Sequence, residues 1–217
     1  MTLFRDRRQA GQELAGELRS RQAKGELTDP VVLALPRGGV TVAQEVARAL
    51  DAPLDVLVAR KIGAPFQEEL GVGAIAGDDP PVFDDRTLGL LGLSAAELAP
   101  VVDRERAELH RREQLYRRGR PALDLRGRTV VVVDDGLATG ATARAALRWV
   151  RGQSPASVLL AVPVCSPEGA DLMGPEADAV VCLHRPPDFM AVGLWYDDFG
   201  QLTDNDVLAA LHSTAEG

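Results

Sequence analysis

Apolar residues follow two alternating patterns along this chain. Short runs of consecutive apolar residues predict buried strands of a parallel sheet, because a strand without polar alternation needs cover on both faces. Segments in which apolar residues recur every three or four positions predict amphipathic helices. Strands are predicted at residues 31–35, 54–59, 130–133, 158–162 and 179–183, and helices at an N-terminal segment ending near Gly25, a segment with Val42, Val46 and Leu50 on one face, residues 141–150 and residues 205–211. This alternation predicts an α/β fold with an open parallel sheet flanked by helices.

The stretch after the second predicted strand breaks the pattern. Residues 60–71 are polar and contain Gly63 and Pro65, which predicts a loop. Two short strand pieces are predicted after it, at residues 74–76 and 82–83, around an Asp-Asp-Pro-Pro turn.

Residues 84–121 are rich in charge and predict a helical insertion. Ser94 is the predicted N-cap, and Pro100 is expected to begin a second helix. Arginines alternate with glutamates here, which favours a solvent-exposed helix with salt bridges over an anion-binding patch. A role as a lid or as a dimer contact stays open. No repeat or linker divides the sequence, so a single domain is predicted over residues 1–217.

Composition narrows the class of protein. The chain has 217 residues, of which 46% are hydrophobic and 4% aromatic, and this predicts an interior of Ala, Val and Leu. The formal net charge of -8 argues against general nucleic-acid binding. No apolar run approaches the roughly 20 residues of a membrane span, and the first residues lack the apolar core of a signal peptide, so a cytoplasmic protein without a membrane partner is predicted. Cys165 and Cys182 lack metal-site spacing and are predicted to be buried, reduced thiols.

The most informative segment is VVVVDDGLATGAT, residues 130–142. Its strand ends at two carboxylates, and a turn of small residues then leads into a helix, whose first N–H groups and dipole favour an anion such as phosphate. Thr139 and Thr142 can add hydroxyl donors, while Gly140 lets a ligand approach the backbone. The candidate binding residues of this segment are Asp134, Asp135, Gly136, Leu137, Ala138, Thr139, Gly140, Ala141 and Thr142.

Carboxylates beside a phosphate cradle would repel an anion unless they bind sugar hydroxyls or help to hold a cation, and a phosphorylated ribose meets both conditions. The alternative is a strand-to-helix turn with a capping Asp. The segment resembles the phosphoribosyl pyrophosphate (PRPP) signature of type I phosphoribosyltransferases. The resemblance implies that Asp134 and Asp135 bind the ribose 2′ and 3′ hydroxyls, and that the following loop holds the 5′-phosphate.

Two further motifs resemble loops of the same family. ALPRGGV, residues 34–40, resembles the pyrophosphate loop, which implies that the N–H groups of Arg37, Gly38 and Gly39 meet the pyrophosphate. ARKIGAP, residues 59–65, resembles the mobile loop that closes over the active site, where Arg60 and Lys61 would neutralise the departing pyrophosphate. A glycine turn and ordinary surface charge are the respective alternatives.

The resemblance leaves proton transfer open. This chain has Ala138 where 6-oxopurine enzymes commonly carry an acidic residue, so the signature is more similar to adenine-type members. Those members place a glutamate in the mobile loop. Glu69 is the candidate catalytic residue here, Glu68 is its neighbour, and a solvated loop carboxylate is the alternative reading of both.

A C-terminal segment supplies the candidate base pocket. FMAVGLWYDDF, residues 189–199, gathers several of the scarce aromatic residues, and type I enzymes build the base pocket from a small hood. Phe189, Trp195 and Tyr196 would offer a stacking face. Asp197 or Asp198 would be a hydrogen-bond acceptor, and plain packing of the hood core is the alternative. The hood is predicted at about residues 184–217, with a contribution from the N-terminus.

Nearly the whole chain resembles a bacterial subgroup of predicted phosphoribosyltransferases. The resemblance implies transfer of the 5-phosphoribosyl group from PRPP to a nitrogenous base, purine-like favoured, in nucleotide salvage. It also implies Mg²⁺ bound mainly through PRPP, with no dedicated protein metal site, and a homodimer. A non-catalytic PRPP- or nucleotide-sensing regulator is the alternative, while the Walker and Rossmann glycine motifs are absent.

Overall fold

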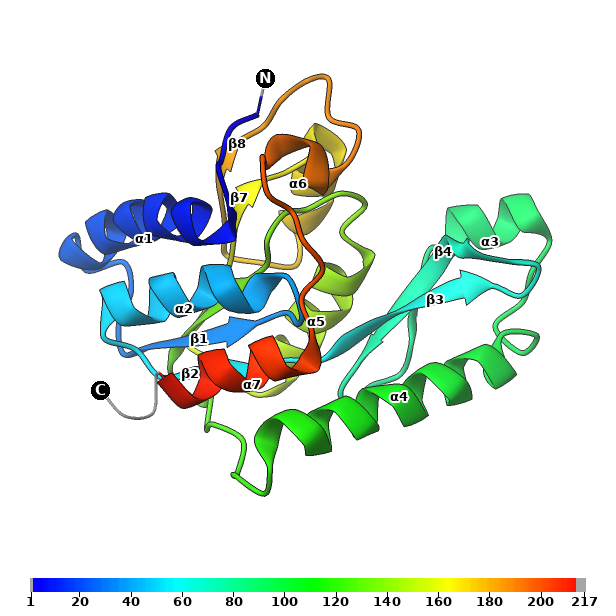
Figure 1. The fold of residues 1–217 in the computed structure, drawn as a ribbon. Helices are drawn as coiled ribbons and strands as arrows, with labels where there is room; N and C mark the ends of the chain where they lie inside the picture. The colour runs from blue at the N-terminus through cyan, green and yellow to red at the C-terminus, as the bar shows by residue number, and fades with distance from the viewer. Residues whose placement is uncertain (1, 214–217) are drawn as a thin grey trace.

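A five-stranded parallel sheet forms the centre of the computed structural model, which describes residues 2–213 (Figure 1). Every neighbouring pair of strands is parallel, so the predicted α/β class and open parallel sheet are confirmed. In spatial order the strands are β2 (Leu54–Val56), β1 (Pro30–Ala34), β6 (Thr129–Val133), β7 (Ser157–Val164) and β8 (Ala179–His184).

The strand order reverses between β1 and β6. After β1 the chain continues to β2 on one side, whereas after β6 it continues to β7 and β8 on the other. In open α/β sheets a reversal of this kind opens a crevice at the carboxyl ends of the two strands. The predicted pyrophosphate loop follows β1 and the acidic pair follows β6, so the two motifs lie side by side where such a crevice is expected.

Both faces of the sheet are covered, which explains the uninterrupted valines of β6. Val131 and Val133 belong to one buried cluster, with α1 (Arg7–Ala23), α2 (Gly39–Leu50) and the C-terminal α7 (Asp204–Ser213). Val130 and Val132 belong to the cluster on the other face. That cluster includes residues of α5 (Ala141–Gly152) and α6 (Pro167–Met173).

A second unit extends away from the parallel sheet (Figure 1). It contains a three-stranded antiparallel sheet and two helices, which we call the projecting unit. Its elements are β3 (Ala59–Ala64), β4 (Gln67–Ala76), β5 (Val82–Phe83), α3 (Asp85–Leu91) and α4 (Ala99–Arg117).

The predicted loop at residues 60–71 is wrong, because this stretch forms most of the β3–β4 hairpin. Gly63 lies at a shift in the pairing register, and Pro65 lies in the two-residue turn between the strands, so neither residue breaks the sheet. The predicted strand at 54–59 is also divided, since β2 ends at Val56 and Ala59 already belongs to β3. The expected helix start at Pro100 is confirmed within a residue by α4.

The N-terminal segment pairs with the segment that follows β8. Phe4 forms a parallel bridge with Tyr196, next to the short 3-10 helix η1 (Val192–Trp195), which the sequence pattern did not predict. Cys165 is buried and Cys182 is half-buried, and both are free thiols, so the prediction is correct except for the partial exposure of Cys182. Among residues 2–213, none of the helices combines the length and the apolar character that crossing a membrane requires.

Candidate functional site

The acidic pair lies at the carboxyl end of β6, where the strand order reverses. Asp134 accepts a hydrogen bond from the N–H of Asp135 at 2.8 Å. The carboxylate of Asp135 accepts one from Nε of Arg7 at 2.7 Å, and the Arg7 and Asp135 side chains are only 11% and 13% exposed. The hydroxyl of Tyr196 donates to the carbonyl oxygen of Asp135 at 2.6 Å. A residue of α1 therefore holds the carboxylate of Asp135, and a residue of the C-terminal segment holds its main chain.

The two carboxylates differ in their electrostatic surroundings. Burial raises the pKa of Asp134 well above its usual range, and the adjacent Asp135 carboxylate raises it further. Burial also raises the pKa of Asp135, but the hydrogen bond and charge of Arg7 oppose this rise. In the free protein Asp134 is therefore the member of the pair that takes up a proton more readily.

The predicted pyrophosphate loop packs directly against the acidic pair. A Cβ atom on Gly39 would come within 2.6 Å of the Val133 carbonyl oxygen, and one on Gly38 would collide with the Asp135 carboxylate. The Pro36–Arg37 peptide bond is cis. The Gly39 N–H donates to the Leu35 carbonyl, whereas the N–H groups of Arg37 and Gly38 have no acceptor among residues 2–213. Two of the three predicted backbone donors are thus free for a ligand.

The predicted phosphate-binding loop is hydrogen-bonded to the end of β7 at its beginning, and at its end it leads into the first N–H groups of α5. Leu137 is buried, and its N–H and carbonyl groups bond to Val164 and Ser166, which anchors the loop to β7. Gly140 adopts a φ of 76°, which favours glycine. The first intrahelical bond of α5 runs from Arg144 to the Gly140 carbonyl at 2.8 Å, so the N–H groups before Arg144 precede the helical ladder.

Side-chain caps are distributed unevenly among the helices. Asp6, Asp84 and Ser166 cap the N-termini of α1, α3 and α6 with their side chains. The helices that follow the two motifs, α2 and α5, have no such cap, and α4 also lacks one. At α2 the first N–H groups already donate to carbonyl groups of the preceding loop. At α5 the N–H groups before Arg144 have no acceptor among residues 2–213, as an anion-binding helix end requires.

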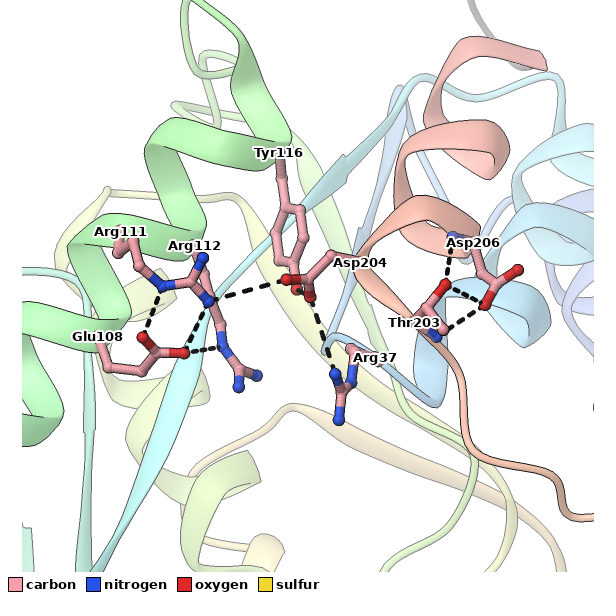
Figure 2. Close-up of polar contacts among 8 residues, drawn as sticks. All are labelled: Arg37, Glu108, Arg111, Arg112, Tyr116, Thr203, Asp204 and Asp206. Carbon is pink, nitrogen blue, oxygen red and sulfur yellow. Dashed lines mark hydrogen bonds and ion pairs between the residues drawn. The ribbon is translucent and has the colours of Figure 1, made fainter.

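Arg37 reaches toward a polar cluster that sequence reasoning missed (Figure 2). Its guanidinium lies 3.9 Å from the Asp204 carboxylate, and this carboxylate accepts a hydrogen bond from the Tyr116 hydroxyl at 2.6 Å. Arg111 lies 3.7 Å from the same carboxylate. Tyr116 belongs to α4 and Asp204 to α7, so the cluster joins the projecting unit to the pyrophosphate loop. No local sequence signal marks this contact.

The candidate catalytic residues of the β3–β4 hairpin are paired with acids inside the projecting unit. Arg60 donates two hydrogen bonds to the Glu105 carboxylate, at 3.0 and 2.6 Å. Lys61 donates to the Glu69 carbonyl at 3.0 Å and lies 3.7 Å from its carboxylate. Glu68 pairs with Arg104. Within residues 2–213, no hydrogen bond or ion pair joins any of these hairpin residues to the acidic pair.

The candidate base-pocket residues lie together at the C-terminal end of the sheet. The rings of Phe189 and Trp195 are stacked with centroids 6.4 Å apart, and Asp197 accepts a hydrogen bond from Thr2 at 2.6 Å. A Cβ atom on Gly136 would come 2.5 Å from a methyl group of Val192. Val192 therefore packs against the signature loop, beside the contact of Tyr196 with Asp135.

A metal ion is implied by the resemblance, and the donor set can be tested for it. Among the described residues, no cluster of three or more His, Cys, Asp or Glu side chains is arranged to hold a metal ion. The two carboxylates at the crevice fit an ion only if a bound ligand supplies most of the oxygen atoms, as the phosphate and hydroxyl groups of PRPP can.

Comparison with known proteins places these features in a family. A family model described as "Phosphoribosyl transferase domain" matches residues 5–194. A Mycobacterium tuberculosis protein named "Putative phosphoribosyl transferase" is 47% identical over 211 residues, which are 97% of this chain and 47% of that protein. The chain thus spans about half the length of the curated relatives it matches.

Solved structures agree with the fold. A crystal structure of a protein from Thermus thermophilus is 46% identical, with a TM-score of 0.80 over 98% of this chain and 99% of that one. A hypoxanthine phosphoribosyltransferase from Staphylococcus aureus is 13% identical, with a TM-score of 0.50 over 87% of this chain and 78% of that one. The second likeness shows a shared fold.

Proposed function

This chain belongs to the phosphoribosyl transferase domain family, and on this premise we propose that it transfers the 5-phosphoribosyl group of PRPP to a nitrogenous base, with purine-like bases favoured, and releases pyrophosphate. In this reaction the bond between C1′ and the pyrophosphate oxygen breaks, and a bond between C1′ and a nitrogen of the base forms. The proposal includes a role in nucleotide salvage, a cytoplasmic location and a homodimer.

One observation carries the proposal. The acidic pair, the glycine loop and the uncapped end of α5 converge where the strand order reverses between β1 and β6. Each part suits a different portion of PRPP. Asp134 and Asp135 would accept hydrogen bonds from the ribose hydroxyls, residues 136–142 would hold the 5′-phosphate, and Arg37, Gly38 and Gly39 would hold the pyrophosphate.

Arg37 supports the pyrophosphate assignment. Its guanidinium is 40% exposed and lies 3.9 Å from Asp204, a separation that gives a weak ion pair in water. A pyrophosphate carries more charge than one carboxylate and offers several oxygen atoms to a guanidinium. Arg37 would therefore exchange Asp204 for the ligand when PRPP binds.

The β3–β4 hairpin is the proposed source of charge neutralisation for the leaving group. Lys61 is 43% exposed and its partner Glu69 is 95% exposed, so this pair costs little to separate. Movement of the hairpin toward the crevice would bring Lys61 to the pyrophosphate and Glu69 toward the proton of the base. Arg60 would have to leave Glu105 to join them, so Lys61 is the readier of the two cations.

Mg²⁺ bound through the phosphate and ribose oxygens of PRPP would supply further neutralisation of the leaving pyrophosphate. The residues of this chain would orient the donor and exclude water from C1′. Phe189 and Trp195 are the proposed stacking face for the base and Asp197 its hydrogen-bond acceptor. The exposure of Asp197 and its hydrogen bond to the hydroxyl of Thr2 leave it able to exchange partners.

The test is pyrophosphate release with PRPP, Mg²⁺ and a panel of purine and pyrimidine bases. We expect release with at least one base, and no release without a base. Calorimetry with PRPP alone distinguishes the alternatives. Binding of PRPP without release for any base would favour a sensing regulator, and absence of PRPP binding would refute both proposals.

A further inference from the structure

We propose that Arg7 is a positioning residue that holds the Asp135 carboxylate in the orientation needed to bind a ribose hydroxyl. The inference rests on the proposed function, because it concerns how the acidic pair meets PRPP. Arg7 lies at the first position of α1, far from the signature segment in the sequence, and the sequence analysis gives it no role at the site.

The Asp135 carboxylate is wedged between two neighbours. Arg7 Nε donates to its Oδ2 atom at 2.7 Å from one side. On another side the carboxylate occupies the space that a Cβ atom on Gly38 would fill. The carboxylate therefore has little freedom to rotate, and its remaining oxygen atom is held in a defined place at the crevice.

Arg7 is itself fixed by the C-terminal segment. The centre of its guanidinium lies 3.8 Å from the centroid of the Phe199 ring, within cation–π distance. Its Nη1 atom donates to the Gly200 carbonyl at 2.8 Å. Three different groups thus hold one planar cation: a carboxylate, a ring face and a carbonyl oxygen. A lysine could keep the charge but not the flat stacking and the forked donors.

Fold stability alone does not explain why the Arg7–Asp135 ion pair is nearly buried and held by several groups. Removing two charges from water is costly, and a nearly buried pair contributes little net stability compared with apolar packing. The pair also lies beside a second acid, Asp134, whose pKa the Asp135 carboxylate raises. An arginine that favours the charged form of Asp135 and fixes its direction is explained by ligand binding better than by folding.

Replacement of Arg7 should be compatible with folding. The side chain lines a cavity of about 340 Å³ together with Asp6, Arg8, Asp198 and Gly200, so a shorter polar residue there stays in contact with water. Arg8 offers a matched control from the same turn of α1. It bonds to Glu45 instead of the acidic pair, and its side chain is 63% exposed.

The experiment measures binding of Mg²⁺–PRPP and of inorganic pyrophosphate by calorimetry, together with KM for PRPP and kcat. For Arg7→Gln we expect PRPP affinity to fall roughly 10- to 100-fold, because the buried partner of Asp135 is lost. Pyrophosphate lacks the ribose hydroxyls, so its affinity should change less than about twofold. KM for PRPP should rise with the loss of affinity, while kcat changes little.

Three further variants separate positioning from folding. Arg7→Lys should recover only part of the affinity, because it restores the charge without the stacked fork. Phe199→Leu keeps the arginine but removes the ring under it, and should also weaken PRPP more than pyrophosphate. Arg8→Gln should match the wild-type protein in both titrations. Thermal unfolding checks that each variant is folded.

Two outcomes would overturn the inference. Equal PRPP affinity in Arg7→Gln, Arg8→Gln and the wild-type protein would show that Arg7 does not act on Asp135. Equal losses for PRPP and pyrophosphate in both Arg7→Gln and Phe199→Leu would show a general effect on the fold. A wild-type protein that binds no PRPP would instead refute the proposed function, and the role of Arg7 with it.

Discussion

The acidic pair at the carboxyl end of β6, which we call the acidic edge of the sheet, and the β3–β4 hairpin hold their charged groups in different ways. At the edge, Arg7 and Asp135 are joined at 2.7 Å and are nearly buried. In the hairpin, Lys61 and the almost fully exposed Glu69 are joined at 3.7 Å. Exposed ion pairs of the second kind contribute little to stability and exchange partners readily. The Asp135 carboxylate is thus held in place by a protein group, whereas the Lys61–Glu69 pair costs little to separate.

This difference suits the two halves of the proposed reaction. Binding of PRPP needs groups that are already oriented, because ordering them on binding would cost free energy. Stabilisation of the leaving group needs charge that arrives only when the site closes and water is excluded. Arg60 is intermediate, since its bonds to the nearly buried Glu105 tie the base of the hairpin to α4.

Substitution of the acidic pair should have the largest effect on PRPP binding, because these carboxylates are the groups proposed to bind the ribose. Asp134→Asn or Asp135→Asn should lower PRPP affinity about 100-fold, since each change weakens a charge-assisted hydrogen bond to ribose. Calorimetry with Mg²⁺–PRPP provides the measurement, and Asp103→Asn, an exposed change on α4, is the control. Wild-type affinity in both variants would remove the assigned role.

Substitution of Lys61 tests the role proposed for the β3–β4 hairpin. Lys61→Ala should lower kcat roughly 10- to 50-fold while PRPP affinity changes less than about threefold, because the ammonium group acts on the leaving charge. Steady-state kinetics of pyrophosphate release test this. Lys24 is the other lysine of the chain, so Lys24→Ala is a matched control at an exposed site at the end of α1. An unaltered turnover number would contradict the hairpin assignment.

The same comparison explains what the sequence could predict. The parallel strands are readable from local runs such as the valines of β6, and the two motifs lie where those strands end. The hairpin was readable only at residues 74–76, because the burial of the rest depends on distant partners: Ile62 and Val72 belong to the same buried cluster as Leu109 of α4. Its alternation of polar and small residues has the appearance of a loop until α4 and α5 cover it.

The positions of the candidate side chains follow the same rule. The acidic pair and the glycine loop come together because adjacent parallel strands carry both motifs to one edge. Contacts between segments that lie far apart in the sequence leave no local sequence pattern. Arg7 and Asp135 are 128 residues apart, and Tyr116 and Asp204 are 88 residues apart. Only the folded chain shows which residues of α1 and of the C-terminal segment contact Asp135.

Loss of the Glu105 carboxylate should loosen the hairpin at its base. Glu105→Gln should lower the free energy of unfolding by about 1–2 kcal/mol, because Arg60 would lose a charged partner that is largely shielded from water. Denaturant unfolding measures the change. Glu69→Gln, at the exposed end of the hairpin, is the matched control and should change stability by less than about 0.5 kcal/mol. Equal effects of the two changes would remove the distinction between the base and the tip.

The smallest predicted effect is a difference in the free energy of unfolding between substitutions of Asp134 and of Asp135. Because the pKa of Asp134 is raised in the folded protein, folding favours the protonated form of this group. The resulting penalty is absent below the unfolded pKa of about 4 and grows as pH rises through the folded pKa. Asp134→Asn removes the penalty, so the variant should exceed the wild-type free energy of unfolding by up to about 1 kcal/mol at neutral pH, and by little near pH 4.

Thermal unfolding between pH 4 and 8 tests whether Asp134→Asn gains stability over the wild-type protein as the pH rises. Asp135→Asn is the informative comparison. The pKa of Asp135 is also raised by burial, so its removal relieves a penalty of the same kind. The change also leaves the nearly buried Arg7 without its charged partner, which costs more, so it should lower stability at neutral pH. The two neighbouring substitutions should therefore both weaken PRPP binding but shift the melting temperature in opposite directions. A pH-independent gain for Asp134→Asn, or the same sign of change for both variants, would show that the pair is not divided into a strained carboxylate and a supported one.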